Sequence, residues 1–106
     1  MSIRNALLEL RNLNITSFQD SENFLQRFPP DMQETILAAV LLGRDHFHKE
    51  ELRDDIPMDT SGILGLNFDE YPKKLYEIRG NIESYINSLI HCADNSNFNL
   101  DNIKTS

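Results

Sequence analysis

The stretch PDMQETILAAVLLG, residues 30–43, predicts the central helix of the fold. Pro30 suits the first turn of a helix, where N–H groups lack partners, and Asp31 and Glu34 favour the positive end of the helix dipole. We expect the helix to end at Gly43, because glycine readily adopts the left-handed conformation that stops helices. The following apolar side chains form a stripe at helical spacing: Met32, Ile36, Leu37, Val40 and Leu41.

Helical patterns flank this stretch on both sides. Ser2 is a suitable N-cap for a first helix, and a second, short helix is expected from residue 20 or 21 up to Pro29, which cannot continue it. A last helical region is expected over residues 69–92, where apolar residues recur at spacings of three and four from Leu75 to Ile90. Since this pattern crosses Gly80, it predicts either one helix bent there or two helices in close succession.

These patterns predict an all-α fold: a compact single-domain bundle of about five helices with an irregular acidic loop. A chain of 106 residues that is 40% hydrophobic and 25% charged is typical of one globular domain. We expect residues 1–93 to form the helical domain. The polar run that follows predicts a mobile C-terminal tail over residues 94–106.

Acidic residues are concentrated between residues 44 and 70, where eight of them accompany three basic residues. A short helix is expected from about His48 to Asp55, followed by a loop from Pro57 to Asn67. Crowded like charges repel one another, so the segment is either an ordinary acidic surface or a patch that a basic partner neutralises. The predicted partner-binding residues are Asp45, Glu50, Glu51, Asp54, Asp55, Asp59, Asp69, Glu70 and Tyr71, with Ile63 and Leu64 as further apolar contacts.

The charge balance favours a basic protein as partner. A net charge of −7 argues against direct nucleic-acid binding and against anionic membrane surfaces, because both need lysine and arginine. The longest apolar run has seven residues, whereas a membrane span needs about 20. The first residues lack the apolar core of a signal peptide, so we expect a cytoplasmic protein.

The sequence predicts no catalytic residues, no metal site and no cofactor. His46 and His48 are the candidate metal ligands, but residues two apart share a face on a strand and not on a helix. Cys92 is the single cysteine, so it forms no intrachain disulfide, and we expect a structural thiol. Since the carboxylates lie in a solvated run, we expect a protein that is not an enzyme.

Residues 28–45, with FPPDMQE at their start and LLGRD at their end, resemble an uncharacterised bacterial helical domain family. In that family an apolar helix ends in Gly-Arg-Asp or Gly-Arg-Gly-Asp, and an amphipathic helix closes the domain. The chain departs from the family by lacking its tryptophan and by carrying the acidic insertion. The resemblance implies a bacterial helical fold and no particular activity.

In size, charge and lack of a catalytic set, the chain also resembles bacterial immunity proteins of contact-dependent growth inhibition systems. The resemblance implies a small cytoplasmic inhibitor of a toxin, often a nuclease, whose basic cleft an acidic patch would occupy. Two other hypotheses remain open: a helical adaptor or homodimer that uses the last helix, and a metal-dependent enzyme around His46 and His48. The sequence leaves open which partner is bound and whether its active site is blocked.

Overall fold

The computed structural model describes residues 2–63 and 65–105, and these residues form helices joined by loops. The α-helices are α1 (Ile3–Asn12), α2 (Phe18–Leu25), α3 (Pro30–Asp45), α4 (Tyr71–Glu77) and α5 (Ile82–Asn95). The 3-10 helices are η1 (Thr60–Ile63), η2 (Phe68–Glu70), η3 (Arg79–Asn81) and η4 (Leu100–Asn102). The described residues contain no strand, which confirms the predicted all-α, single-domain bundle of five α-helices. None of the helices in this part of the chain has the length and apolar character needed to cross a bilayer.

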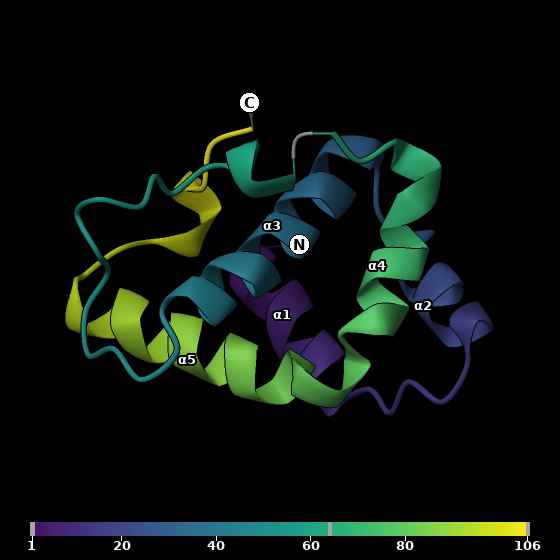
Figure 1. The fold of residues 1–106 in the computed structure, drawn as a ribbon, viewed down its shortest axis with the longest axis horizontal. Helices are drawn as coiled ribbons and strands as arrows, with labels where there is room; N and C mark the ends of the chain where they lie inside the picture. The colour runs from purple at the N-terminus through teal and green to yellow at the C-terminus, as the bar shows by residue number, and fades with distance from the viewer. Residues whose placement is uncertain (1, 64, 106) are drawn as a thin grey trace.

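The bundle is organised around α3, which crosses the middle of the molecule (Figure 1). Its most extensive packing is against α5, while α1 packs on both of these helices and α2 packs on α4. The molecule measures 34 × 26 × 24 Å. Figure 1 shows α2 and α4 at one end of its long axis, and the loop after α3 together with the C-terminal segment at the other.

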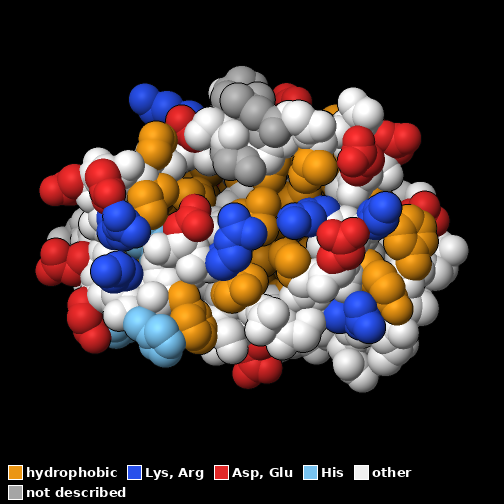
Figure 2. Space-filling model, in the orientation of Figure 1, with side chains coloured by type: hydrophobic (Ala, Val, Ile, Leu, Met, Phe, Trp, Pro, Cys, Tyr) orange, Lys and Arg blue, Asp and Glu red, His pale blue; other side chains and the backbone are white. Residues whose placement is uncertain are grey.

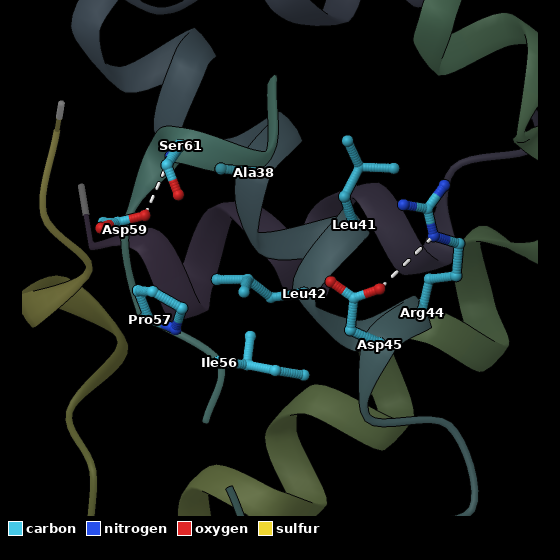
Figure 3. Close-up of a pocket in the computed structure, with 9 residues that line it drawn as sticks. All are labelled: Ala38, Leu41, Leu42, Arg44, Asp45, Ile56, Pro57, Asp59 and Ser61. Carbon is cyan, nitrogen blue, oxygen red and sulfur yellow. Dashed lines mark hydrogen bonds and ion pairs between the residues drawn. The ribbon is translucent and has the colours of Figure 1, made fainter. Parts of the chain in front are cut away.

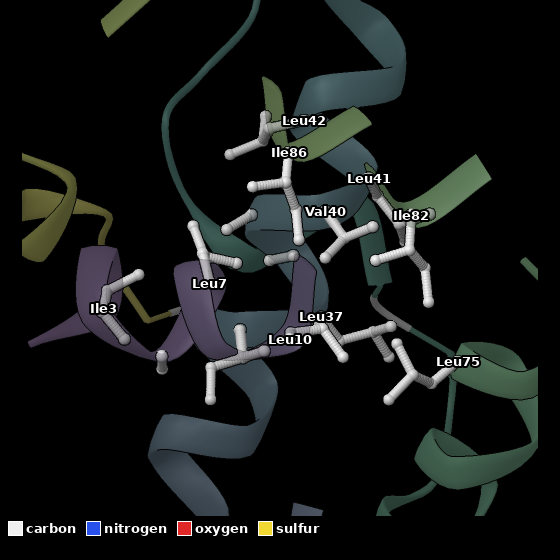
Figure 4. Packing of buried hydrophobic residues seen from close by; sticks show 14 of the residues in the cluster. Ile3, Leu7, Leu10, Leu37, Val40, Leu41, Leu42, Leu75, Ile82 and Ile86 are labelled. Atoms are coloured by element: carbon white, nitrogen blue, oxygen red, sulfur yellow. The ribbon is translucent and has the colours of Figure 1, made fainter. Parts of the chain in front are cut away.

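The core explains why α3 is apolar on nearly all sides. Every residue from Thr35 to Gly43 is buried, because other elements cover the helix around its whole circumference. Figure 4 shows its leucines meeting side chains from α1, α4 and α5. The largest fully buried apolar side chains are Leu7, Leu10, Leu25, Ile36, Leu37, Leu75, Ile86, Leu89, Leu100 and Val40.

The predicted end of α3 at Gly43 is wrong, since the helix continues to Asp45. Gly43 is needed for a different reason, namely the close approach of α5. A Cβ atom at this position would lie 2.0 Å from the carbonyl oxygen of Tyr85. Only a residue without a side chain therefore allows the two central helices to cross at this distance.

The capping serines account for the starts of the first two helices. Ser2 caps α1 as predicted, with its Oγ accepting the N–H of Asn5 at 3.1 Å. Helix α2 begins earlier than expected, at Phe18, because Ser17 is its N-cap. Towards the C-terminus, Gly80 lies in η3, so the second of the two predicted alternatives holds: α4 and α5 are separate helices.

The segment over residues 94–106, which the sequence predicts to be a mobile tail, instead folds back on the helices over its described part. Helix α5 extends to Asn95, and the side chains of Leu100 and Ile103 are buried in the core. Asp101 accepts the N–H of Ile3 at 2.7 Å and so joins the two ends of the chain. The helical domain therefore does not end at residue 93, because residues of the C-terminal segment are part of its core. Leu100 and Ile103 are the two apolar residues that anchor this polar segment to the core.

Candidate functional site

The acidic loop, which we define as residues 46–59, connects α3 to η1 at one end of the molecule (Figure 1). It contains five acidic and two basic residues. Its backbone forms turns and bends, so the helix predicted from about His48 to Asp55 is wrong. One reason is that His48 adopts the left-handed conformation with φ of 68°, which an α-helix cannot contain.

His46, directly after α3, ties the acidic loop to that helix. Its side chain is fully buried, with Nδ1 2.7 Å from the carbonyl oxygen of Leu42 and Nε2 3.0 Å from the backbone nitrogen of Arg53. A carbonyl oxygen can only accept and an amide N–H can only donate, so the ring is neutral with its proton on Nδ1. Both ring nitrogens are therefore engaged within the protein.

The C-terminal end of α5 holds the middle of the loop through side chains. Three hydrogen bonds use polar groups of the loop backbone that a helix would have paired internally. They run from Asn95 Nδ2 to the Glu50 carbonyl oxygen (2.7 Å), from the Leu52 N–H to Ser96 Oγ (3.0 Å), and from Cys92 Sγ to the Lys49 carbonyl oxygen (3.4 Å). These bonds keep the irregular loop in one conformation.

Four carboxylates of the loop region have partners within the molecule. Asp55 accepts hydrogen bonds from the Arg53 guanidinium, which lower the pKa of its carboxyl. Glu50 Oε2 lies 3.1 Å from Nε2 of His91, and Asp45 Oδ1 lies 3.8 Å from Nε of Arg44. Ser61 is the partner of the fourth carboxylate: hydrogen bonds from its side chain and from its N–H, the latter at 2.9 Å, lower the pKa of Asp59.

Glu51 and Asp54 differ from the other acidic residues of the loop in the interactions of their carboxylates. Both side chains are exposed, and within residues 2–63 and 65–105 neither forms a hydrogen bond or ion pair. Arg53 lies between them in sequence but directs its guanidinium to Asp55. A positively charged partner could reach both carboxylates without first breaking an interaction in this protein.

Asp69, Glu70 and Tyr71 do not belong to this site. They lie at the junction of η2 and α4, towards the end of the molecule occupied by α2 (Figure 1). Glu70 accepts the N–H of Asn67 in a capping box, and the side chain of Tyr71 is 8% exposed. The acidic side chains accordingly appear at both ends of the face in Figure 2, with lysines and arginines among them.

The nine predicted contact residues thus form two groups, and only the six from residue 45 to residue 59 lie in the acidic loop or directly before it. The apolar contacts predicted with them are placed differently. Ile63 is a core residue with 3% exposure, whereas Leu64 lies outside the described residues. Buried apolar side chains are not available to a partner unless the fold opens.

Phe47 is 42% exposed at the start of the acidic loop. Its ring lies 4.1 Å from that of His48 and 6.2 Å from that of Tyr85, measured between centroids. An aromatic residue in a polar stretch directly after an apolar helix was the signal available in the sequence. Exposed aromatic rings often provide the anchoring area of protein interfaces.

A cavity of about 160 Å³ lies between the C-terminal half of α3 and the second half of the acidic loop (Figure 3). Its apolar floor includes Ala38, Leu42 and Ile56. Asp45 and Asp59 contribute carboxylates to it from opposite sides (Figure 3). The sequence could not predict this cavity, because its two walls are far apart along the chain and meet only when the loop folds back on α3.

Comparisons with family models, curated proteins and solved structures find no match to this chain. No relative therefore supplies a residue role for the site.

Two chemical groups that would suggest catalysis are placed unfavourably for it. Burial, and secondarily the charge of Glu50, raises the pKa of the Cys92 thiol, so the sulfur stays protonated at neutral pH. His46 has no free ring nitrogen to offer a metal ion. Among the described residues, no three His, Cys, Asp or Glu side chains are grouped as metal ligands would be.

Proposed function

We propose that this chain is a non-enzymatic protein-binding inhibitor of the immunity type, which neutralises a bacterial, nuclease-type toxin through its acidic loop. The observation that carries the proposal is that hydrogen bonds from distant parts of the chain hold an irregular, negatively charged loop against α3 and α5. His46 fixes the start of the loop and Asn95 fixes its middle, while Glu51 and Asp54 remain exposed.

A fixed loop suits binding because the conformational entropy has already been lost on folding. Ordering an interface on association weakens affinity, so a preorganised loop binds more tightly than a mobile one with the same charges. The backbone bonds that α5 makes to Glu50 and Leu52 serve this purpose without using any carboxylate. The side chains stay available while the chain that carries them is anchored.

The charge of the loop suits a basic partner. Residues 46–59 carry five acidic and two basic residues, a net charge of −3 within a chain of net charge −7. Opposite potentials steer encounter and raise the association rate, and carboxylates can replace phosphate groups in the cleft of a nuclease. Phe47 adds an exposed aromatic ring beside these charges, where a tight complex needs buried apolar area.

The alternative, an adaptor or homodimer that uses the last helix, has less support from the surface of α5. The exposed residues of that helix are polar or charged: Glu83, Ser84, Asn87, His91, Asp94 and Asn95. Homodimer interfaces are more apolar than the rest of the surface. Sedimentation of the purified chain tests this alternative directly, since a stable dimer would favour it.

The experiment for the inhibitor function begins with capture of binding proteins from the native host, using the tagged chain. The captured protein is then titrated with wild type and with the double variant Glu51→Lys/Asp54→Lys at two salt concentrations. We expect the double variant to bind at least tenfold more weakly and to show a smaller salt dependence.

The matched control is the double variant Asp69→Lys/Glu77→Lys, which reverses two exposed acidic residues outside the loop site. It should retain wild-type affinity apart from a small general effect of net charge. Equal losses in the control and in the loop variant would show that only total charge matters. Unchanged binding by the loop variant would refute the acidic loop as the contact surface.

A further inference from the structure

The cavity beside the acidic loop combines an apolar floor with carboxylates at its edge. Ala38, Leu42 and Ile56 supply apolar surface, and Asp45 and Asp59 face the same space from α3 and from the loop (Figure 3). Its volume of about 160 Å³ suits a single long side chain rather than a cofactor. Three charged residues line it, Arg44, Asp45 and Asp59, so its net charge is −1.

Asp45 is an unfavourable residue for folding at its position. It is the last residue of α3, where the negative end of the helix dipole repels a carboxylate. Its ion-pair partner in the described part of the chain is the adjacent Arg44, whose Nε lies 3.8 Å away, and both side chains are nearly half-exposed; the charge of Arg53 also acts on it. So loose a surface contact contributes little, and a partner can replace it readily.

Asp59 is held in place on the other side of the cavity. Its Oδ1 accepts the N–H of Ser61 at 2.9 Å. Its backbone also pairs with the backbone of Lys104 in an isolated β-bridge. Hydrogen bonds from Ser61, and the nearby charge of Lys104, keep this carboxylate ionised by lowering its pKa. The two aspartates therefore present carboxylate oxygens to the cavity from two different elements, α3 and the end of the acidic loop.

We propose that this cavity receives an arginine side chain of the protein partner, an inference that rests on the proposed inhibitor function. The methylene stem of an arginine would lie on Leu42 and Ile56, because such stems pack on apolar surface while the charged group stays at the edge. The guanidinium would then lie between Asp45 and Asp59. Its planar set of donors suits two carboxylates better than the single ammonium group of lysine does.

The test uses N-acetyl-arginine amide as the probe and NMR chemical shifts of the labelled chain as the readout. Titration into the tens of millimolar should shift the amide signals of Ala38, Leu42, Ile56 and Ser61 in a saturable way. The neutral analogue N-acetyl-citrulline amide, of nearly the same shape, should bind about tenfold more weakly or not at all. N-acetyl-lysine amide should bind more weakly than the arginine probe.

Two substitutions remove the charges and keep the shape: Asp45→Asn and Asp59→Asn. An asparagine at residue 59 can still accept the N–H of Ser61, so the loop should stay folded. Each variant should lose about tenfold in affinity for the arginine probe, while Asp69→Asn should lose none. Unchanged amide spectra away from the substituted residue confirm that the variants are folded.

The inference is overturned if the arginine probe gives no saturable shifts around the cavity, or if citrulline binds equally well. Equal binding of the arginine probe by Asp45→Asn and by wild type would overturn it too. These results are separate from the Glu51 and Asp54 experiment, which concerns the outer side of the loop. Failure of the probe with intact loop-dependent partner binding would refute the arginine site alone.

Discussion

Gly43 of α3 lies so close to Tyr85 of α5 that a Cβ atom on Gly43 would stand 2.0 Å from the Tyr85 carbonyl oxygen. The obstacle is backbone and not a flexible side chain, so it cannot move aside without shifting the helix. Gly43→Ala should therefore lower the free energy of unfolding by about 2–3 kcal/mol, as strained overpacking does elsewhere. Chemical denaturation of the two proteins measures this difference.

The matched control for that substitution is Gly80→Ala. A Cβ atom added at Gly80 would meet nothing within 4 Å, so its stability should stay within about 1 kcal/mol of wild type. If Gly43→Ala proved as stable as this control, the close crossing of α3 and α5 would be refuted.

His46→Ala should loosen the acidic loop and lower stability. The substitution leaves the Arg53 N–H without its acceptor and empties a fully buried site, which together cost about 2–4 kcal/mol. Hydrogen exchange of the Arg53 amide is the direct readout, and it should become markedly faster. Undiminished protection of that amide would rule out His46 as the anchor.

His48→Gly is the complementary substitution two residues further on. His48 has a φ of 68°, which glycine adopts without steric cost. The His48→Gly variant should therefore be as stable as wild type or more stable, by up to about 1 kcal/mol in the free energy of unfolding. A loss of stability here would indicate that the exposed ring of His48 contributes more through its contact with Phe47 than the strained backbone costs.

Leu100→Ala and Ile103→Ala test whether the C-terminal segment belongs to the core. Both side chains are buried, so each truncation should lower the free energy of unfolding by about 2–4 kcal/mol. Thr105→Ala, at an exposed position, should change it by less than about 0.5 kcal/mol. A mobile tail would instead give three variants of equal stability.

Acid should destabilise the chain partly through Asp20. Hydrogen bonds from the Thr16 N–H and then from the Thr16 hydroxyl lower the pKa of Asp20 below its ordinary value of 3.8. A lowered folded-state pKa adds stability that is fully present above the ordinary value and is lost as the pH falls through the folded value. Asp20→Ala should therefore be less stable at neutral pH and lose less stability on acidification. Urea titrations at several pH values would contradict this if both proteins lost stability in parallel.

Local patterns predicted the elements that depend on local physics. The Ser2 cap, the proline at the start of α3 and the apolar stripe along it correctly predicted a bundle with α3 at its centre. The role of Gly43 was misassigned because glycine both stops helices and permits close crossings. Only the position of Tyr85 in three dimensions distinguishes the two.

The acidic loop was harder to predict because its conformation depends on distant residues. Its composition favoured a short helix, yet its backbone groups are bonded to Asn95 and Ser96, more than 40 residues away in sequence. Sequence proximity alone groups the predicted contact residues at 69–71 with the loop. In the folded chain η1 intervenes, and these residues join α4 at the other end of the bundle.

The single cysteine gives the chain an internal reporter. Cys92 is buried, and its sulfur lies 3.4 Å from the Lys49 carbonyl oxygen, under the loop. An alkylating reagent cannot reach that sulfur while the loop is packed against the C-terminal end of α5. When reclosing is fast, the labelling rate is proportional to the small fraction of molecules that have lifted the loop at any instant. Alkylation kinetics at neutral pH would thus measure the free energy of that lifting in unmodified protein.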